Sequence, residues 1–213
     1  CDVLASLRTL HEYGMVHGNV KTENVFVIRE TRPDGTRGEA RGMLVDPCAT
    51  RLLSPASIDV HSSGLFSVLG TAKAIAPEQA RGAELDARSD IYAMGVLMYE
   101  TVAGQPPFEG ESAIDVMAQH LSTVPESPST FARRGWVSPE LDELILHALA
   151  KEPAARFQST QELLEAIQDV GEPMRRKVPL DRAAFDELVE VLPADPYNEE
   201  KANELEELAR QSR

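Results

Sequence analysis

The sequence predicts a mainly helical domain that carries one small β-hairpin. Three observations support this prediction: apolar residues recur at helical spacing near the start, residues 91–103 are apolar nearly all round, and three later segments open with helix-capping signals. The chain has 213 residues, of which 42% are hydrophobic and 26% are charged, so it can bury a full-sized core. This composition disfavours a disordered chain, a collagen and a membrane bundle.

The first expected element is a helix that ends near Gly14. Its apolar residues are Val3, Leu4, Leu7 and Leu10. Two short apolar runs follow at 24–28 and 43–45, and the turn signal Pro-Asp-Gly lies between them at 33–35. The two runs therefore predict a β-hairpin whose extended polar loop covers residues 29–42.

The middle of the chain predicts a long loop and then the core. Residues 46–76 are rich in Ser, Ala and Gly and lack helical or strand periodicity, which is typical of a functional loop. Because residues 91–103 are apolar on every side before Gly104, we expect a helix there at the centre of the core. Three further helices are expected to begin after Ser112, Ser138 and Ser159.

The last part of the chain is strongly charged. Three basic residues lie together at 175–177, and two weak amphipathic segments follow at 185–192 and 202–209. We expect residues 1–170 to form the domain and residues 171–213 to form a charged helical extension or linker. A solvated surface is the favoured interpretation of the extension, and a partner-binding helix pair is the alternative.

Charge and cysteine content restrict the partners and the compartment. Lys and Arg number 21 against 35 Asp and Glu, a net charge of −14, so a general binder of phosphate backbones is disfavoured and no nucleic-acid partner is expected. Cys1 and Cys48 are too few for a disulfide framework and form no zinc pattern, which favours the reducing cytoplasm. No apolar stretch reaches about 18 residues, so no membrane segment is expected in this chain.

The start of the chain predicts a truncation. Cys1 stands where a Met is usual, and the first residues already follow a helical pattern, so we expect the sequence to open inside an element. A mature lipoprotein also begins with cysteine, but a flexible polar tether usually follows that cysteine, which disfavours this alternative.

The segment with the most chemical information covers residues 17–24, His-Gly-Asn-Val-Lys-Thr-Glu-Asn, and is followed by an apolar strand and Asp46. It resembles the catalytic loop of protein kinases, H-R-D-L-K-x-x-N, with the metal-binding Asp of the D-F-G motif one hairpin later. Four further matches follow in the order of the family: Gly70-Thr71, Ala76-Pro77-Glu78, Ser89-Asp90-Ile91-Tyr92 and Lys151-Glu152-Pro153-Ala154-Ala155-Arg156-Phe157. Each match is weak alone, but five matches in the order of the family are strong evidence. Their residues are most similar to those of bacterial Hanks-type serine/threonine kinases.

The resemblance covers about residues 1–170 and implies the large helical lobe of the protein-kinase-like fold. The sequence contains neither a Gly-rich G-x-G-x-x-G loop nor a V-A-I-K strand, so the small lobe is expected to be absent from the chain. A complete kinase domain needs about 250 to 300 residues, more than this chain provides once its extension is set aside.

The resemblance implies an impaired catalytic site. The position of the catalytic Asp is Asn19, whose neutral amide cannot take a proton from the attacking hydroxyl near neutral pH. Loss of a positioned base typically costs about 10²–10⁴-fold in rate. The neighbouring Arg of the family is Gly18, so a phosphorylated activation segment lacks its usual local partner. Pro47 and Cys48 replace the Phe and Gly of D-F-G, so Asp46 is expected to be held rigidly or aimed wrongly.

Other implied site residues are retained. Lys21 matches the residue that neutralises the transferring phosphoryl group, and Asn24 and Asp46 match the two magnesium ligands. Thr71 matches a position that supports the catalytic loop in serine/threonine kinases. The resemblance is thus compatible with ATP and Mg²⁺ binding in the intact protein, and little such binding is expected without a small lobe.

Four matched residues are expected to be architectural. The resemblance implies that His17 packs under the site and that Asp90 ties the backbone of the catalytic loop to the central helix. Glu78 and Arg156 match the structural ion pair of the family, which would join the activation segment to the late helices.

Three functions remain open from the sequence. The preferred hypothesis is a bacterial pseudokinase domain that positions partners or a nucleotide for signalling or scaffolding. The second is an active ATP-dependent serine/threonine kinase that works when a small lobe is present and relies on a substitute base or on electrostatics. The third is a pure protein-interaction module that acts through the acidic extension. Each of them implies a protein partner or a protein substrate.

Overall fold

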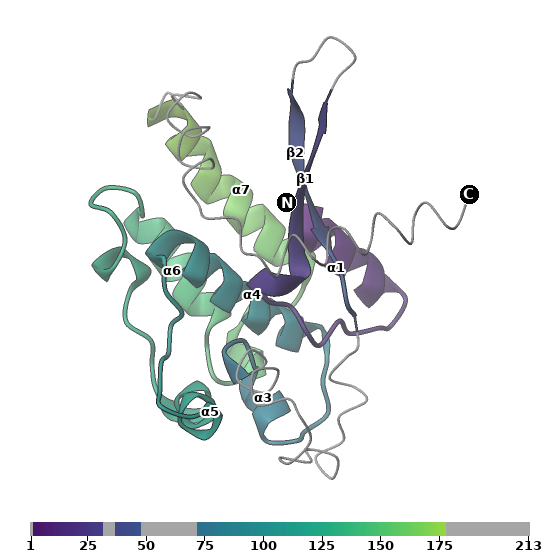
Figure 1. Ribbon diagram of the computed structural model, residues 1–213, viewed down its shortest axis with the longest axis vertical. Coiled ribbons are helices and arrows are strands. Elements are labelled where there is room, and N and C mark those ends of the chain that lie inside the picture. Colours follow the sequence, from purple (N-terminus) through teal and green to yellow (C-terminus); the bar gives the residue numbers. More distant parts are fainter. Residues whose placement is uncertain (1, 32–36, 48–71, 178–213) are drawn as a thin grey trace. The chain divides into compact units, whose positions relative to one another are not determined.

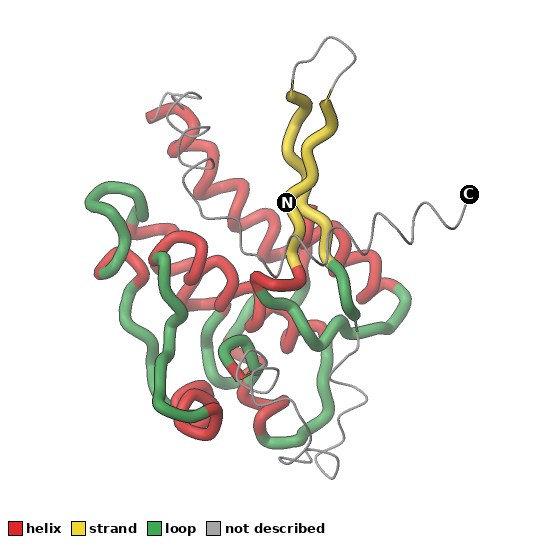
Figure 2. Tube along the Cα trace, viewed as in Figure 1, coloured by secondary structure: helices red, strands yellow, loops and turns green. Residues whose placement is uncertain are grey.

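The computed structural model describes residues 2–31, 37–47 and 72–177 (Figure 1). The chain divides into two compact units, Cys1–Val170 and Gly171–Arg213. The described part of the first unit is mainly helical and contains one two-stranded sheet, as Figure 2 shows. The predicted fold class, a mainly helical domain with one hairpin, is confirmed for the described residues.

The first helix, α1 (Asp2–Glu12), has the predicted position and the predicted end. Leu4 and Leu7 are buried in the core. The helix stops at Gly14, whose φ of 68° lies in the left-handed region that glycine adopts without steric cost.

The hairpin consists of β1 (Val25–Thr31) and β2 (Arg37–Leu44), which pair antiparallel from Val25 opposite Leu44 to Thr31 opposite Arg37. The prediction of an extended polar loop at 29–42 is wrong, because both strands continue through most of that range. A two-stranded ribbon leaves many side chains in solvent, so polar residues continue its backbone ladder as readily as apolar residues do. The turn signal at 33–35 lies outside the described residues.

The central helix, α4 (Ala87–Ala103), is buried along most of its length, as predicted. It ends at Gly104, which has a φ of 75°, and it begins four residues before the predicted start because the side chain of Asp86 caps it by accepting from the Arg88 N–H at 2.8 Å. It packs against α6 (Pro139–Ala148). The core also includes Leu144, Ile145, Ala148, Leu149, Phe157 and Leu163.

The three predicted helix starts are confirmed. In α5 (Ala113–Ser122) the Ser112 hydroxyl accepts from the Asp115 N–H at 3.2 Å, and Asp115 accepts in return from the Ser112 N–H at 3.0 Å. Ser138 caps α6. Ser159 caps α7 (Thr160–Lys177), but the carboxylate of Glu162 accepts from the Gln158 N–H at 2.6 Å, one residue before the position that a capping box predicts.

Short helical elements complete the described structure. They are α3 (Pro77–Ala80) and the 3-10 turns η1 (Thr22–Asn24), η4 (Pro128–Thr130) and η5 (Pro153–Ala155). Most of the predicted loop at 46–76, and both amphipathic segments at 185–192 and 202–209, lie outside the described residues. Among the helices that the structure describes, none combines the length and apolar character needed to cross a membrane.

Candidate functional site

The loop that follows α1 is held by Asp90 of α4. The carboxylate of Asp90 is fully buried and accepts hydrogen bonds from the backbone N–H groups of His17 and Gly18, each at 2.8 Å. His11 Nε2 lies 2.8 Å from the same carboxylate. A buried carboxylate requires such donors because it has lost its hydration. The tie between this loop and the central helix is therefore present in the structure.

His11 was not predicted from the sequence as part of this arrangement. It follows Leu7 by four residues, so it lies on the face of α1 that also carries the buried leucines. That spacing is the signal that could have found it, because a histidine on an apolar helix face needs a polar partner in the core.

Asn19, Asn24 and Asp46 lie together where the loop meets the hairpin. Asn19 Nδ2 donates to Asp46 Oδ2 at 3.1 Å and lies 3.5 Å from the Asp46 carbonyl oxygen. Asn24 Nδ2 donates to the carbonyl oxygen of Asn19 at 2.8 Å. The Val45 N–H donates to the Asn24 carbonyl at 3.0 Å, so the two ends of the hairpin also meet here. These contacts join the two predicted magnesium ligands to the position of the catalytic base.

Asp46 has an unusual backbone conformation. Its φ is 60°, and no other described residue except glycine has a positive φ. Asp adopts this region more readily than most residues because its short polar side chain can hydrogen-bond locally. Asp46 is thus held by Asn19 in a left-handed conformation, and its side chain is exposed. Cys48 lies outside the described residues.

Lys21 precedes the turn η1 in an extended conformation, with φ −162° and ψ 165°. Its side chain is half-buried and lines a small pocket that Asn19 and Gln79 also line. Gln79 Nε2 donates to the carbonyl oxygen of Gly18, which also lines this pocket, at 3.0 Å. Thr71, the remaining predicted catalytic-site residue, lies outside the described residues.

A pair of carboxylates beside the loop was not predicted from the sequence. Thr22 Oγ1 lies 3.3 Å from Glu23 Oε2 and 3.2 Å from Glu100 Oε2, so its single proton serves one carboxylate at a time. Burial raises the pKa of Glu100, and the charge of Glu23 raises it further, against the opposing hydrogen bond from Thr22. No local sequence pattern indicates the contact between Thr22 and Glu100, because the two residues are 78 positions apart.

His17 is buried beneath the loop, with 1% of its surface exposed. Burial lowers its pKa below the ordinary value of 6.5, and this effect outweighs the opposing charge of Asp90. The Asn19 N–H donates to His17 Nδ1 at 3.3 Å, which requires an unprotonated Nδ1. Both the lowered pKa and this hydrogen bond favour the neutral imidazole.

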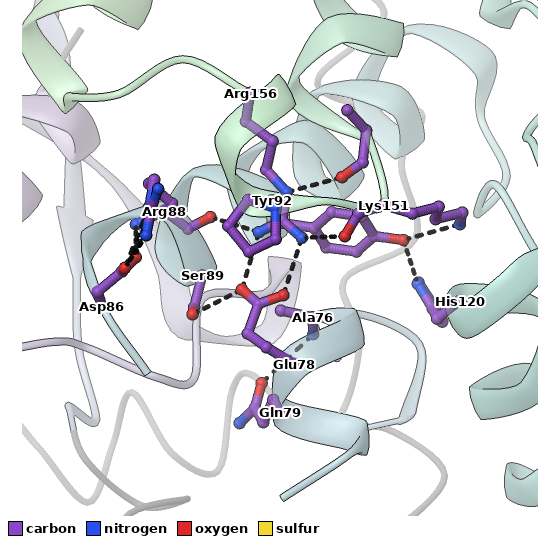
Figure 3. Close-up of polar contacts among 12 residues, drawn as sticks. Ala76, Glu78, Gln79, Asp86, Arg88, Ser89, Tyr92, His120, Lys151 and Arg156 are labelled. Atoms are coloured by element: carbon purple, nitrogen blue, oxygen red, sulfur yellow. Dashed lines mark hydrogen bonds and ion pairs between the residues drawn. The ribbon is translucent and has the colours of Figure 1, made fainter. Parts of the chain in front are cut away.

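Glu78 and Arg156 form a buried ion pair (Figure 3). Arg156 Nη1 and Nη2 each lie 2.8 Å from one carboxylate oxygen of Glu78. Ser89 Oγ also donates to Glu78 at 2.7 Å. Burial alone would raise the pKa of Glu78, but the hydrogen bonds from Arg156 and Ser89 hold it below the ordinary value of 4.5.

All five N–H donors of Arg156 are used. Two of them bind Glu78, and the other three donate to the carbonyl oxygens of Ala150, Arg88 and Lys151 at 2.7, 2.9 and 2.9 Å. Full satisfaction of the guanidinium is the condition under which a buried ion pair is tolerated. This pair connects α3 to α4 and to the segment before α7.

A second buried polar cluster lies on the other side of Tyr92 (Figure 3). The Tyr92 hydroxyl lies 2.8 Å from His120 Nδ1, and Lys151 Nζ donates to the same hydroxyl at 3.3 Å. His120 Nε2 lies 3.0 Å from the Lys73 carbonyl oxygen. Burial, together with the charge of Lys151, lowers the pKa of His120 to about 4. This cluster, not predicted from the sequence, links α4 and α5 to the segment before α3.

The donor set is compatible with a hard cation that also binds phosphate. Asn24 and Asp46 offer amide and carboxylate oxygens, and magnesium typically takes one or two carboxylates together with substrate phosphates and water. Within the described ranges there is no group of three or more His, Cys, Asp or Glu side chains placed to hold a metal. Asn24 and Asp46 therefore fit a magnesium ion whose remaining ligands would be phosphate and water.

Comparison with known proteins agrees with the order of the motifs. The family model described as the protein kinase domain matches residues 1–166. A probable serine/threonine-protein kinase of Streptomyces coelicolor is 35% identical over 175 residues, which are 81% of this chain and 24% of that protein. Serine/threonine-protein kinase PknB of Mycolicibacterium smegmatis is 36% identical over 162 residues, which are 76% of this chain and 24% of that protein.

Serine/threonine-protein kinase pkn3 of Myxococcus xanthus is 34% identical over 176 residues, 82% of this chain and 31% of that protein. The chain thus spans only 24% to 31% of the length of these curated relatives. The match of the family model covers well over half of the chain. The chain belongs to the protein kinase domain family, and it is a serine/threonine protein kinase-like domain of the bacterial Hanks type.

Proposed function

We propose that this chain is part of a catalytically impaired kinase, a pseudokinase, that acts in bacterial signalling or scaffolding. The observation that carries the proposal is Asn19 in the position of the catalytic base. In phosphoryl transfer by kinases the attacking hydroxyl gives up its proton to a carboxylate. The amide of Asn19 is neutral and uses an N–H of Nδ2 to bind Asp46, so it offers no basic atom for that proton.

Nucleotide binding is proposed to survive the loss of the base in the intact protein. Asn24 and Asp46 would hold Mg²⁺, and Lys21 would neutralise phosphate charge together with that ion. The ion supplies charge stabilisation when it is bound. In a chain of net charge −14, few cations other than Lys21 are expected to serve the phosphates. We expect weak binding of ATP to residues 1–170 alone, because phosphate positioning in this family uses both lobes.

The partner is proposed to be a protein, either a client of the scaffold or a former substrate. The relatives are described as serine/threonine-protein kinases, a class that acts on proteins, and the acidic composition disfavours nucleic acid. We place the kinase-like domain at residues 1–170 and the extension at 171–213, which agrees with the division into two compact units. The cytoplasm is the proposed location, because the two cysteines suggest a reducing compartment.

The test compares γ-phosphate transfer by three forms of the protein: the natural sequence, Asn19→Asp and Lys21→Ala. The proposal predicts that the natural protein transfers no faster than Lys21→Ala, because both lack a working site. Asn19→Asp is expected to gain about 10²–10⁴-fold, the usual contribution of a positioned base. Transfer by the natural protein that is lost in Lys21→Ala would show an active kinase instead.

Nucleotide binding separates the pseudokinase from a pure interaction module. A rise in the thermal midpoint on adding ATP with Mg²⁺, lost in Lys21→Ala, is expected if the nucleotide site is retained. No rise, combined with capture of a partner that is lost when residues 171–213 are deleted, would favour the interaction module.

A further inference from the structure

The hydrogen bond from Asn19 to Asp46 is one that the family's residue could not make. An Asp at position 19 would place a second carboxylate where Asn19 Nδ2 now lies, 3.1 Å from Asp46 Oδ2. Two carboxylates at that distance repel each other unless a proton or a cation lies between them. We propose that Asn19 is a positioning residue that holds Asp46 in place without a metal ion. The inference rests on the proposed function only in treating Asp46 as the magnesium ligand.

Asp46 needs such a partner because its conformation is costly. A residue with a Cβ pays about 1–2 kcal/mol in the left-handed region, and the φ of Asp46 is 60°. Its side chain is exposed, so packing contributes little to its position. Asn19, in contrast, is 8% exposed and belongs to a loop that Asp90 fixes through two backbone hydrogen bonds. The amide is therefore a rigid donor aimed at a residue that has few other constraints.

The contacts around this bond form a closed ring. Asn19 donates to Asp46 through its side chain, and its own carbonyl accepts from Asn24 Nδ2 at 2.8 Å. The Asn24 carbonyl accepts at 3.0 Å from the N–H of Val45, the residue before Asp46. Both predicted magnesium ligands are thus hydrogen-bonded to Asn19, Asp46 as an acceptor and Asn24 as a donor. In this proposal, these hydrogen bonds join the loop to the end of β2 in place of a bound Mg²⁺ ion.

The consequence is a change in metal dependence. With Asn19, Asp46 is held in place without Mg²⁺, and Mg²⁺ alone, without a nucleotide, adds little stability because it must displace the amide from one carboxylate oxygen. With Asp at position 19 the segment requires a cation to relieve the repulsion. Asn19→Asp should therefore lower the stability of the metal-free protein and restore a response to Mg²⁺.

The test measures the thermal midpoint, Tm, of the purified natural-sequence protein and three variants: Asn19→Asp, Asp46→Asn and the double swap of both. Each is measured with EDTA and with Mg²⁺ at matched ionic strength, without nucleotide. The Tm of Asn19→Asp is expected to be lower than that of the natural protein by about 3 °C or more in EDTA, and Mg²⁺ is expected to restore most of this loss. The double swap is expected to return close to the natural Tm, because Asn at position 46 then donates to Asp at position 19.

Gln168→Glu is the matched control, since it adds one negative charge at an exposed position of α7. It is expected to change Tm by less than about 1 °C and to show no Mg²⁺ response beyond that of the natural protein. The proposal is overturned if Asn19→Asp keeps the natural Tm in EDTA, or if the effects of the two single substitutions add without recovery in the double swap. Should Asn19→Asp fail to fold in EDTA, the Tm of the double swap still decides the matter.

The outcome is independent of catalysis. If the natural protein proves to be an active kinase, the pseudokinase proposal fails, while the recovery of Tm in the double swap still supports the role of Asn19. If the double swap shows no recovery, the positioning role fails, and the absence of a base at position 19 is unaffected.

Discussion

Single atoms decide the chemistry of this site. Asn19 differs from the Asp of the family by an NH₂ group in place of an oxygen, which removes a base and adds a donor for Asp46. The substitution could be identified from the sequence because the neighbouring motifs fix the position of the residue. The hydrogen bond to Asp46 could not, since it depends on where the end of β2 meets the loop and on the left-handed φ of Asp46.

Asp90 of α4 is expected to be the most sensitive of the polar residues that hold the loop. Asp90→Asn replaces one carboxylate oxygen with an NH₂ group, which would face N–H donors and could not accept from them. The free energy of unfolding should therefore fall by about 3 kcal/mol, as for other broken buried contacts of a charged group. Urea unfolding measures this loss. Asp86→Asn is the matched control, because an exposed N-cap accepts Asn almost as well as Asp. Equal losses in the two variants would contradict the assignment.

Glu78 is expected to make the stability of the protein depend on pH in the acid range. Its pKa in the folded protein is lowered, so its contribution is present above the unfolded value and is lost as the pH falls through the folded value. Glu78→Gln should be less stable at neutral pH, and its stability should decline less than that of the natural protein as the pH falls below the ordinary carboxyl pKa of 4.5. Thermal unfolding against pH tests this, with the exposed Glu84→Gln as control. Parallel curves for Glu78→Gln and the natural protein would be the contrary result.

At the scale of elements, the helices were predictable because each has a local signal. Caps at Ser112, Ser138 and Ser159 and the left-handed Gly104 define their ends. The strands of the hairpin were underestimated because their outer halves are rich in polar residues, although backbone pairing continues through them. The contacts of His120 with Tyr92 and Lys73 could not be predicted, because they join segments 28 and 47 residues apart.

The packing of α4 on α6 leaves no room for a larger residue at Gly95. A Cβ there would lie 3.0 Å from Ala148 Cβ and 3.2 Å from Leu149 Cδ2. Gly95→Ala should therefore destabilise the protein by about 1–3 kcal/mol, although alanine is the better helix former. Adding Ala148→Gly removes the closest contact, so the double variant should lose less than the sum of the single losses. Simple additivity in urea unfolding would argue against this packing.

The cluster of His120, Tyr92 and Lys151 is expected to make the contact between α4 and α5 sensitive to acid. The pKa of His120 is lowered to about 4, so the folded protein keeps it neutral while the unfolded chain takes up a proton near pH 6.5. The contribution of neutral His120 to the free energy of unfolding is complete above pH 6.5 (about the unfolded pKa). It decreases toward pH 4, by about 3 kcal/mol in total. His120→Gln should remove that decline in urea unfolding measured from pH 7 to pH 4. A decline of unchanged slope would exclude His120 as its source.

At the scale of the whole molecule, family membership and catalytic capacity depend on different residues. The kinase family match extends over residues 1–166, and the buried pair of Glu78 and Arg156 and the tie through Asp90 preserve the architecture. These contacts need only a folded core. Phosphoryl transfer needs positioned charge from residues of the site and a base, and the base is the part that Asn19 lacks. The motif order therefore predicted the family and the mainly helical fold, and the impaired chemistry that the departures within the motifs suggest stays a prediction.

The most direct test of the central claim is the rate of γ-phosphate transfer to a protein substrate by the full-length protein that contains this chain. The rate is compared with that of the Lys21→Ala variant under identical ATP and Mg²⁺ conditions. The impaired site predicts equal rates within error for the two proteins. A rate for the natural protein that exceeds the Lys21→Ala rate by about tenfold or more, equivalent to about 1.4 kcal/mol in activation free energy, would contradict the claim that Asn19 leaves the domain without effective catalysis.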